Sequence, residues 1–109
     1  MGNQTSLNSL SVGEVVFSKD LALARISCIL PKAAVVNVIV QDIVGRSRIE
    51  EKFSLEKGNQ VISLNITHLS EGSYNAWISL IDKTFLRNFQ VKKASNNGNW
   101  ISKLKNYFN

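Results

Sequence analysis

The chain has 109 residues, of which 44% are hydrophobic and 19% charged, and its formal net charge is +5. This composition indicates one folded domain rather than a disordered chain, and no apolar run approaches the roughly 20 residues of a membrane-spanning helix. Four lysines and no acidic residue lie between residues 92 and 109, so the first 91 residues carry only +1. The sequence therefore does not predict a nucleic-acid-binding sheet face, which needs basic and aromatic residues together.

Residues 1–11 are polar and rich in serine and asparagine, and we expect a flexible segment there. They contain neither the basic nor the apolar region of a signal peptide. Two locations follow as alternatives: a cytoplasmic protein, or an extracytoplasmic domain whose leader or upstream region is missing.

Residues 12–93 show the period-two alternation of apolar side chains that is typical of β-strands. We expect strands at 12–17, 21–30, 34–43, 49–56, 61–67, 74–81 and 85–91. The third is the richest in β-branched residues and is predicted to be central, whereas the fourth, charged on one face, is predicted at an edge. The alternation in the second slips near Ala24, which predicts a bulge or a strand change.

Turn signals separate these strands. Pro31 ends the second strand, Gly45 allows a tight hairpin with positive φ, and Asp82-Lys83 is the expected two-residue turn of the last hairpin. Seven strands at this spacing predict an all-β fold, an Ig-like or fibronectin III-like antiparallel sandwich. The stretch Leu69-Ser-Glu-Gly-Ser-Tyr74 is the expected tyrosine corner, in which Tyr74 is buried and its hydroxyl bonds to upstream backbone.

The residue types of catalytic and metal sites are sparse. Cys28 is the only cysteine and lies in mid-strand, so we expect a buried thiol and no internal disulfide. His68 is the only histidine and is expected in a loop. Asp42 and Asp82 each end a strand and can meet at one pole, where they would bind calcium, act as acid and base, or only shape turns. The sequence therefore predicts neither an enzyme nor a bound cofactor.

Two apolar regions are candidates for contacts. Trp77 points away from the face that carries Tyr74, so Trp77, Ile81 and Leu86 form either an exposed contact patch or a face covered by a terminal segment. After the polar linker 94–99, apolar residues recur at helical spacing and predict a short, basic, amphipathic helix. This helix packs on the sandwich or docks on a partner or an anionic membrane surface. Its candidate contact residues are Trp100, Ile101, Leu104 and Phe108.

Four motifs follow one another within residues 12–93. They contain, in order, Asp42, Gly45 and Arg46; Gly58, Asn59, Leu64 and Ile66; Leu69, Gly72 and Tyr74; and Val91 and Lys93. The set resembles the Ig-like C-terminal sorting domain of cargo secreted by the bacterial type IX system, and is similar to the Ig-like module of flagellar hook-capping proteins. The chain differs from that pattern in lacking an Asn-Pro pair near the first strand and in continuing past Lys93 through residues 94–109.

The resemblance implies a non-catalytic, extracytoplasmic module that secretion or cell-surface machinery recognises. A protein partner is expected, no nucleic acid, and a surface on the last two strands that includes Lys83, Arg87, Lys92 and Lys93. The alternative is a structural or adhesive Ig-like module that binds protein or glycan through Trp77.

Overall fold

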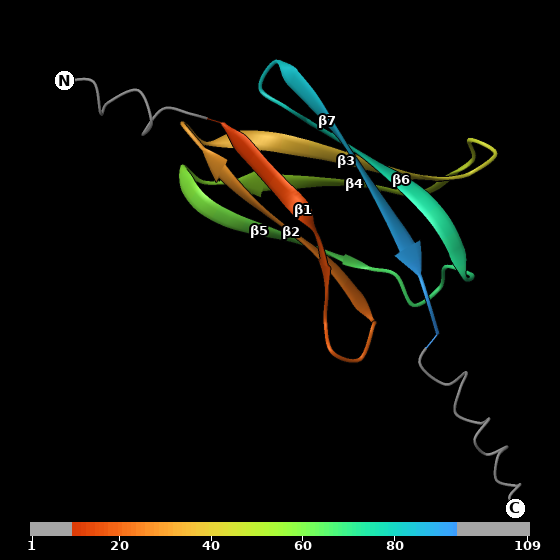
Figure 1. The fold of residues 1–109 in the computed structure, drawn as a ribbon. Helices are drawn as coiled ribbons and strands as arrows, with labels where there is room; N and C mark the ends of the chain where they lie inside the picture. The colour runs from red at the N-terminus through yellow and green to blue at the C-terminus, as the bar shows by residue number, and fades with distance from the viewer. Residues whose placement is uncertain (1–9, 94–109) are drawn as a thin grey trace, which may run out of the picture.

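The computed structural model describes residues 10–93, which form seven antiparallel strands in two sheets (Figure 1). The strands are β1 (Ser11–Phe17), β2 (Leu23–Leu30), β3 (Ala34–Asp42), β4 (Ser47–Leu55), β5 (Gly58–Asn65), β6 (Gly72–Leu80) and β7 (Lys83–Val91). One sheet has the order β1-β2-β5 and the other the order β4-β3-β6-β7. The predicted all-β sandwich is therefore confirmed.

The position of β4 distinguishes this sandwich from the Ig constant-type arrangement. In that arrangement the fourth strand joins the sheet of the first two strands, whereas here β4 pairs with β3 along most of its length. The chain therefore returns to the first sheet between β4 and β5 rather than between β3 and β4. β3 lies between β4 and β6 as a central strand, and β4 forms an edge with charged side chains on its outer face, both as predicted.

The core lies between the sheets and is built by alternate residues of each strand. In β2, for example, Ala24, Ile26, Cys28 and Leu30 are buried while the residues between them are exposed. Tyr74 and Phe89 contribute the buried aromatic rings, with centroids 5.8 Å apart. Among the described residues the buried set contains no polar or charged side chain, so burial of apolar surface is the main stabilising contribution.

The irregularity expected near Ala24 lies elsewhere. β2 pairs with β5 without interruption from Leu23 to Leu30, and the register shift is in β1, between Val12 and Val15. Leu21 is not part of the strand: it lies in the preceding turn with φ at +61°. The sequence pattern seemed to slip because an apolar turn residue was counted as the first residue of the strand.

The last hairpin turns one residue earlier than predicted. Leu80 pairs with Lys83, so the turn consists of Ile81 and Asp82 rather than Asp82 and Lys83. Ile81 has a φ of +59°, a conformation that is unfavourable for a β-branched residue. Gly45, by contrast, takes the positive φ expected of it, at +88°.

Within residues 10–93, no helix is long and apolar enough to cross a membrane. The expected N-terminal segment lies almost entirely outside the described residues. The C-terminal helix, with Trp100, Ile101, Leu104 and Phe108, lies wholly outside them.

Candidate binding surface

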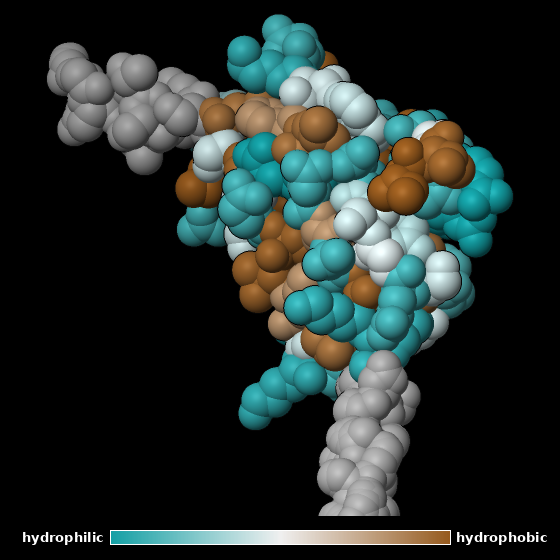
Figure 2. Space-filling model, turned by 45° about the vertical axis from the view of Figure 1, so that its right-hand side comes forward, coloured by the Kyte–Doolittle hydropathy of each residue, from teal (hydrophilic) through white to brown (hydrophobic). Residues whose placement is uncertain are grey.

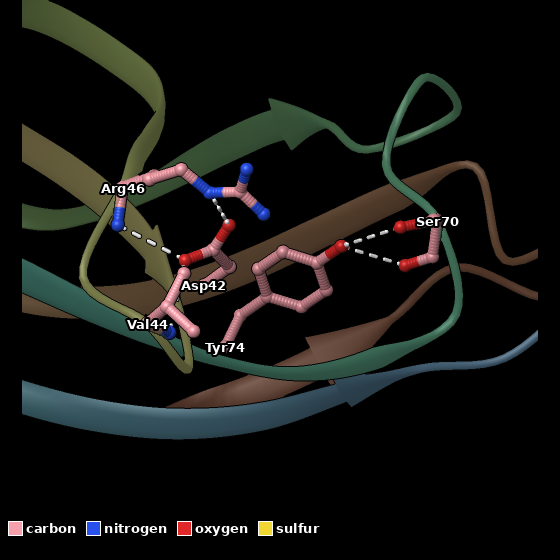
Figure 3. Close-up of polar contacts among 5 residues, drawn as sticks. All are labelled: Asp42, Val44, Arg46, Ser70 and Tyr74. Atoms are coloured by element: carbon pink, nitrogen blue, oxygen red, sulfur yellow. Dashed lines mark hydrogen bonds and ion pairs between the residues drawn. The ribbon is translucent and has the colours of Figure 1, made fainter.

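Tyr74 forms a tyrosine corner at the start of β6 (Figure 3). Its hydroxyl donates to the carbonyl oxygen of Ser70 at 2.7 Å, and its ring stacks on Phe89. Leu69 is buried beneath the corner, and Gly72 has a φ of +149°, which favours glycine. This motif therefore fixes the turn that leads into β6, and its residues are committed to the core.

The turn between β3 and β4 is held by the carboxylate of Asp42. Its Oδ1 accepts hydrogen bonds from the backbone N–H groups of Val44 and Arg46 at 3.1 and 3.0 Å, and its Oδ2 accepts one from Arg46 Nε at 2.9 Å. The bonds from Arg46, those of its backbone first, lower the pKa of Asp42 below its ordinary value. Gly45 completes the turn by donating to the carbonyl of Asp42.

These two motifs, about 30 positions apart in the sequence, lie side by side. Asp42 pairs with Tyr74 in the β3–β6 ladder, and a shallow hollow of about 300 Å³ lies between the two turns. Its lining includes Arg46, Arg48 and Ser73. Gly58 and Asn59 lie at the other pole, because they start β5 just after Leu55, which pairs with the first residue of β3.

The Asp42 turn exposes two large apolar side chains. Ile43 and Val44 are 78% and 68% exposed, the highest values among the large apolar side chains of the described residues. Apolar surface projects at this turn in the space-filling view (Figure 2). The carboxylate of Asp42 bonds the backbone N–H groups of Val44, within the pair, and of Arg46, after it, so the two side chains are presented on a preorganised turn. Sequence reasoning missed them because a β-branched pair at a strand end is also the pattern of a buried strand.

A second apolar feature crosses the outer face of the four-stranded sheet. Trp77 pairs with Ile39 on one side and Leu86 on the other, and all three side chains are partly exposed. The indole N–H donates to Gln41 Oε1 at 3.0 Å. We call Ile39, Trp77 and Leu86 the apolar row. Trp77 and Leu86 are neighbours as expected, Ile39 was missed, and Ile81 lies at the end of the sheet.

Amide side chains lie beside this row. Asn75 pairs with Asn88 two residues along the strands from the Trp77–Leu86 pair, on the same face of the sheet. Asn88 Nδ2 donates a hydrogen bond to Asn75 Oδ1. With Gln41 they form a neutral, polar border next to Trp77. The outer face of β3, β6 and β7 therefore combines an aromatic ring with several hydrogen-bonding amides.

The predicted basic surface is not a single cluster. Lys83 begins β7, while Lys92 and Lys93 follow its end, so about 30 Å of strand separates them at roughly 3.3 Å per residue. The Lys93 ammonium lies 3.3 Å from the carbonyl oxygen of Thr67, and its backbone N–H donates to Glu71.

Arg87 faces inward and joins the two sheets. Its Nε donates to the carbonyl oxygen of Gly13 at 2.9 Å and its Nη2 to that of Val12 at 2.7 Å, both on β1. The guanidinium carbon lies 5.6 Å from the centre of the Phe85 ring, and the side chain is only 20% exposed. Arg87, predicted as a contact residue, is thus engaged within the fold, where its side chain links β7 to β1.

The remaining candidates for catalysis or metal binding do not lie together in the structure. Asp42 lies opposite the first residues of β6 and Asp82 follows its last, so the two carboxylates are at opposite poles and the expected pairing is wrong. His68 is exposed, and burial raises the pKa of the Cys28 thiol. Among residues 10–93, no group of three or more His, Cys, Asp or Glu side chains is placed to hold a metal ion.

Comparison with known protein families and with curated protein sequences found no match to this chain.

Proposed function

We propose that this chain is a non-catalytic, extracytoplasmic binding module of the Ig-like sandwich class, recognised by protein machinery of secretion or of the cell surface, as type IX sorting domains are. The observation that carries the proposal is the Ile43–Val44 pair, exposed on a turn that Asp42 braces. Exposed apolar side chains cost solubility in a monomer, and a rigid turn lowers the entropy lost when a partner binds them.

The family-like motif supports this proposal through its geometry. Asp42, Gly45 and Arg46 shape the turn, while the two positions between Asp42 and Gly45 project into solvent. The motif therefore constrains the backbone and leaves the identity of the projecting residues free to match a partner. This division suits a module whose backbone framework is common to many proteins and whose exposed turn residues determine which partner binds.

The test is a sorting assay in a type IX-competent bacterium. The full chain, behind a periplasmic leader and a reporter, is expected to bring the reporter to the cell surface, and the double change Ile43→Ser with Val44→Ser is expected to retain it in the periplasm. Val16→Ser is the matched control, because Val16 is 63% exposed on β1, away from the turn. Retention of the wild-type reporter inside the cell would contradict the sorting role, and equal sorting by the double variant would contradict the assigned surface.

A second function is favoured by the apolar row. Trp77 is 38% exposed with its N–H fixed by Gln41, and the amides of Asn75 and Asn88 lie beside it. An aromatic face next to neutral amides suits the apolar face and the hydroxyl groups of a sugar ring. If the module is adhesive, a glycan array should show binding by the wild type that Trp77→Ala removes and Ile43→Ser leaves unchanged.

A further inference from the structure

β5 forms an edge of the three-stranded sheet (Figure 1) and pairs there only with β2 among the described residues. The pairing runs without a break from Gly58 to Asn65. At its end, the N–H of Ile66 donates to the carbonyl of Ala22 at 3.0 Å. Because successive residues of a strand point their backbone groups to opposite sides, this bond sets the alternation for the whole strand.

The alternation leaves four residues with backbone groups directed away from β2. Ile66 faces β2, so Asn65, Ser63, Val61 and Asn59 turn their N–H and C=O groups to the open edge. The side chains of the same four residues are exposed on the outer face of the sheet. β5 therefore offers a regular row of donors and acceptors to another strand.

Two of the other three edge strands, β4 and β1, carry features that oppose the addition of a strand. β4 has the charged side chains of Glu50, Glu51 and Lys52, and β1 has a register shift and gives the carbonyls of its bulge to Arg87. Charges and bulges are the usual means by which natural sheets protect their edges. β5, with the sequence GNQVISLN, has no charge, no proline and no bulge.

We propose that this open edge pairs with the β5 strand of a second copy of the chain, antiparallel, about a two-fold axis at Val61. In a symmetric antiparallel pair the residue on the axis lies opposite its own copy, either as a hydrogen-bonded pair or as a non-hydrogen-bonded pair. Val61 directs its backbone groups to the open edge and so forms a hydrogen-bonded pair on the axis, and the same register places Asn59 opposite Ser63 of the second copy. The pairing forms about six N–H···O bonds and joins the sheets of the two copies into one.

Side chains favour this register over those centred on Gln60, Ile62 or Ser63, because only an axis at Val61 places Val61 opposite its own copy. Val61 is 56% exposed, and Ile29 on β2, also exposed, lies diagonally beside it on the same face. Centring the axis on Val61 brings these apolar side chains of both copies into one strip. No like charges meet, because β5 is neutral and Lys57, just before it, falls opposite Asn65 of the second copy.

Sedimentation of the full chain from micromolar to millimolar concentration tests the proposal. The wild type is expected to form dimers as the concentration rises, and Val61→Lys, which sets two like charges against each other on the axis, is expected to weaken the dimer by at least about tenfold. Val16→Lys is the matched control and should dimerise as the wild type does, since Val16 is similarly exposed (63%, against 56% for Val61) but lies on β1. Circular dichroism melting curves establish that both variants fold.

Amide hydrogen exchange identifies the edge directly. The amides of Val61 and Ser63 should gain protection as the concentration rises, whereas those of Gln60 and Ile62, which face β2, should be protected throughout. A chain that stays monomeric, or a dimer that Val61→Lys leaves intact, would overturn the proposal. Protection of Val61 and Ser63 that does not depend on concentration would also overturn it, and would assign the edge to another segment of the same chain.

Discussion

Asp42 and Tyr74 lie opposite each other in the β3–β6 ladder, so that two turns from distant parts of the sequence share one pole of the sandwich. Each residue fixes its own turn: Asp42 through its carboxylate and Tyr74 through its hydroxyl. Asp42 carries an ionisable carboxylate that is partly exposed, whereas Tyr74 is a buried aromatic ring. Substitutions at the two positions should therefore affect stability by different amounts and with different dependence on pH.

Tyr74→Ala should lower the free energy of unfolding by about 3 kcal/mol, because a buried ring and a hydrogen bond are lost together. Tyr74→Phe keeps the ring and its stacking on Phe89, and should cost only about 1 kcal/mol, the net value of the bond to Ser70. Urea denaturation measures both. A loss below about 1 kcal/mol for Tyr74→Ala would contradict its role as a core corner residue.

Asp42→Asn should make stability less dependent on pH in the acid range. The folded-state pKa of Asp42 is lowered, so its contribution is fully present above the unfolded-state pKa and is lost as the pH falls through the folded-state value. The gap in urea midpoint between the wild type and Asp42→Asn should therefore be constant near neutral pH and narrow below about pH 4. Asp20, whose pKa is also lowered, remains in both proteins. A gap that keeps its size down to pH 2 would contradict the assignment.

Arg87→Ala should cost about 1–2 kcal/mol, because two backbone carbonyls of β1 lose a charged donor. Arg87→Lys keeps the charge but cannot reach both carbonyls with a planar fork, and should recover only part of the loss. Lys83→Ala is the control on the same strand and should change stability by less than about 0.5 kcal/mol. Equal effects of Arg87→Ala and Lys83→Ala would argue against a link between the sheets.

Ile81→Asn should stabilise the protein by about 1 kcal/mol, since asparagine tolerates the positive φ of this turn position better than a β-branched residue. Little burial is lost, because the Ile81 side chain is exposed. Asp82→Asn, at the other turn position, should leave the denaturation midpoint nearly unchanged. A destabilising effect of Ile81→Asn would mean that the isoleucine side chain contributes more than its conformation costs.

The strands were predictable because six of the seven have a mainly apolar face with period two, and in β1 the bulge interrupts it. The corner was predictable because Leu69, Gly72 and Tyr74 stand at fixed spacing. The candidate binding surface was harder to predict, because it depends on which strands pair and in which register. Alternation tells which face Trp77 occupies but not that Ile39 is its neighbour. It also cannot place Asp42 and Asp82 at opposite poles, because that follows from which strands pair. Arg87 was predicted as a surface cation because its side chain bonds to the backbone carbonyls of Val12 and Gly13. A backbone acceptor is present at every residue and leaves no pattern in the sequence.

The hydrogen bonds of Arg87 to β1 also have a kinetic consequence. Arg87 bonds to residues 74 and 75 positions earlier in the chain, so its contacts form only when both sheets are in place and closing so long a loop is slow. The Tyr74–Ser70 contact spans four positions and can form early. Loss of the Arg87 link should therefore appear mainly as faster unfolding, and loss of the corner as slower folding. The residues whose contacts form first during folding need not be those whose contacts most slow the unfolding of the sandwich.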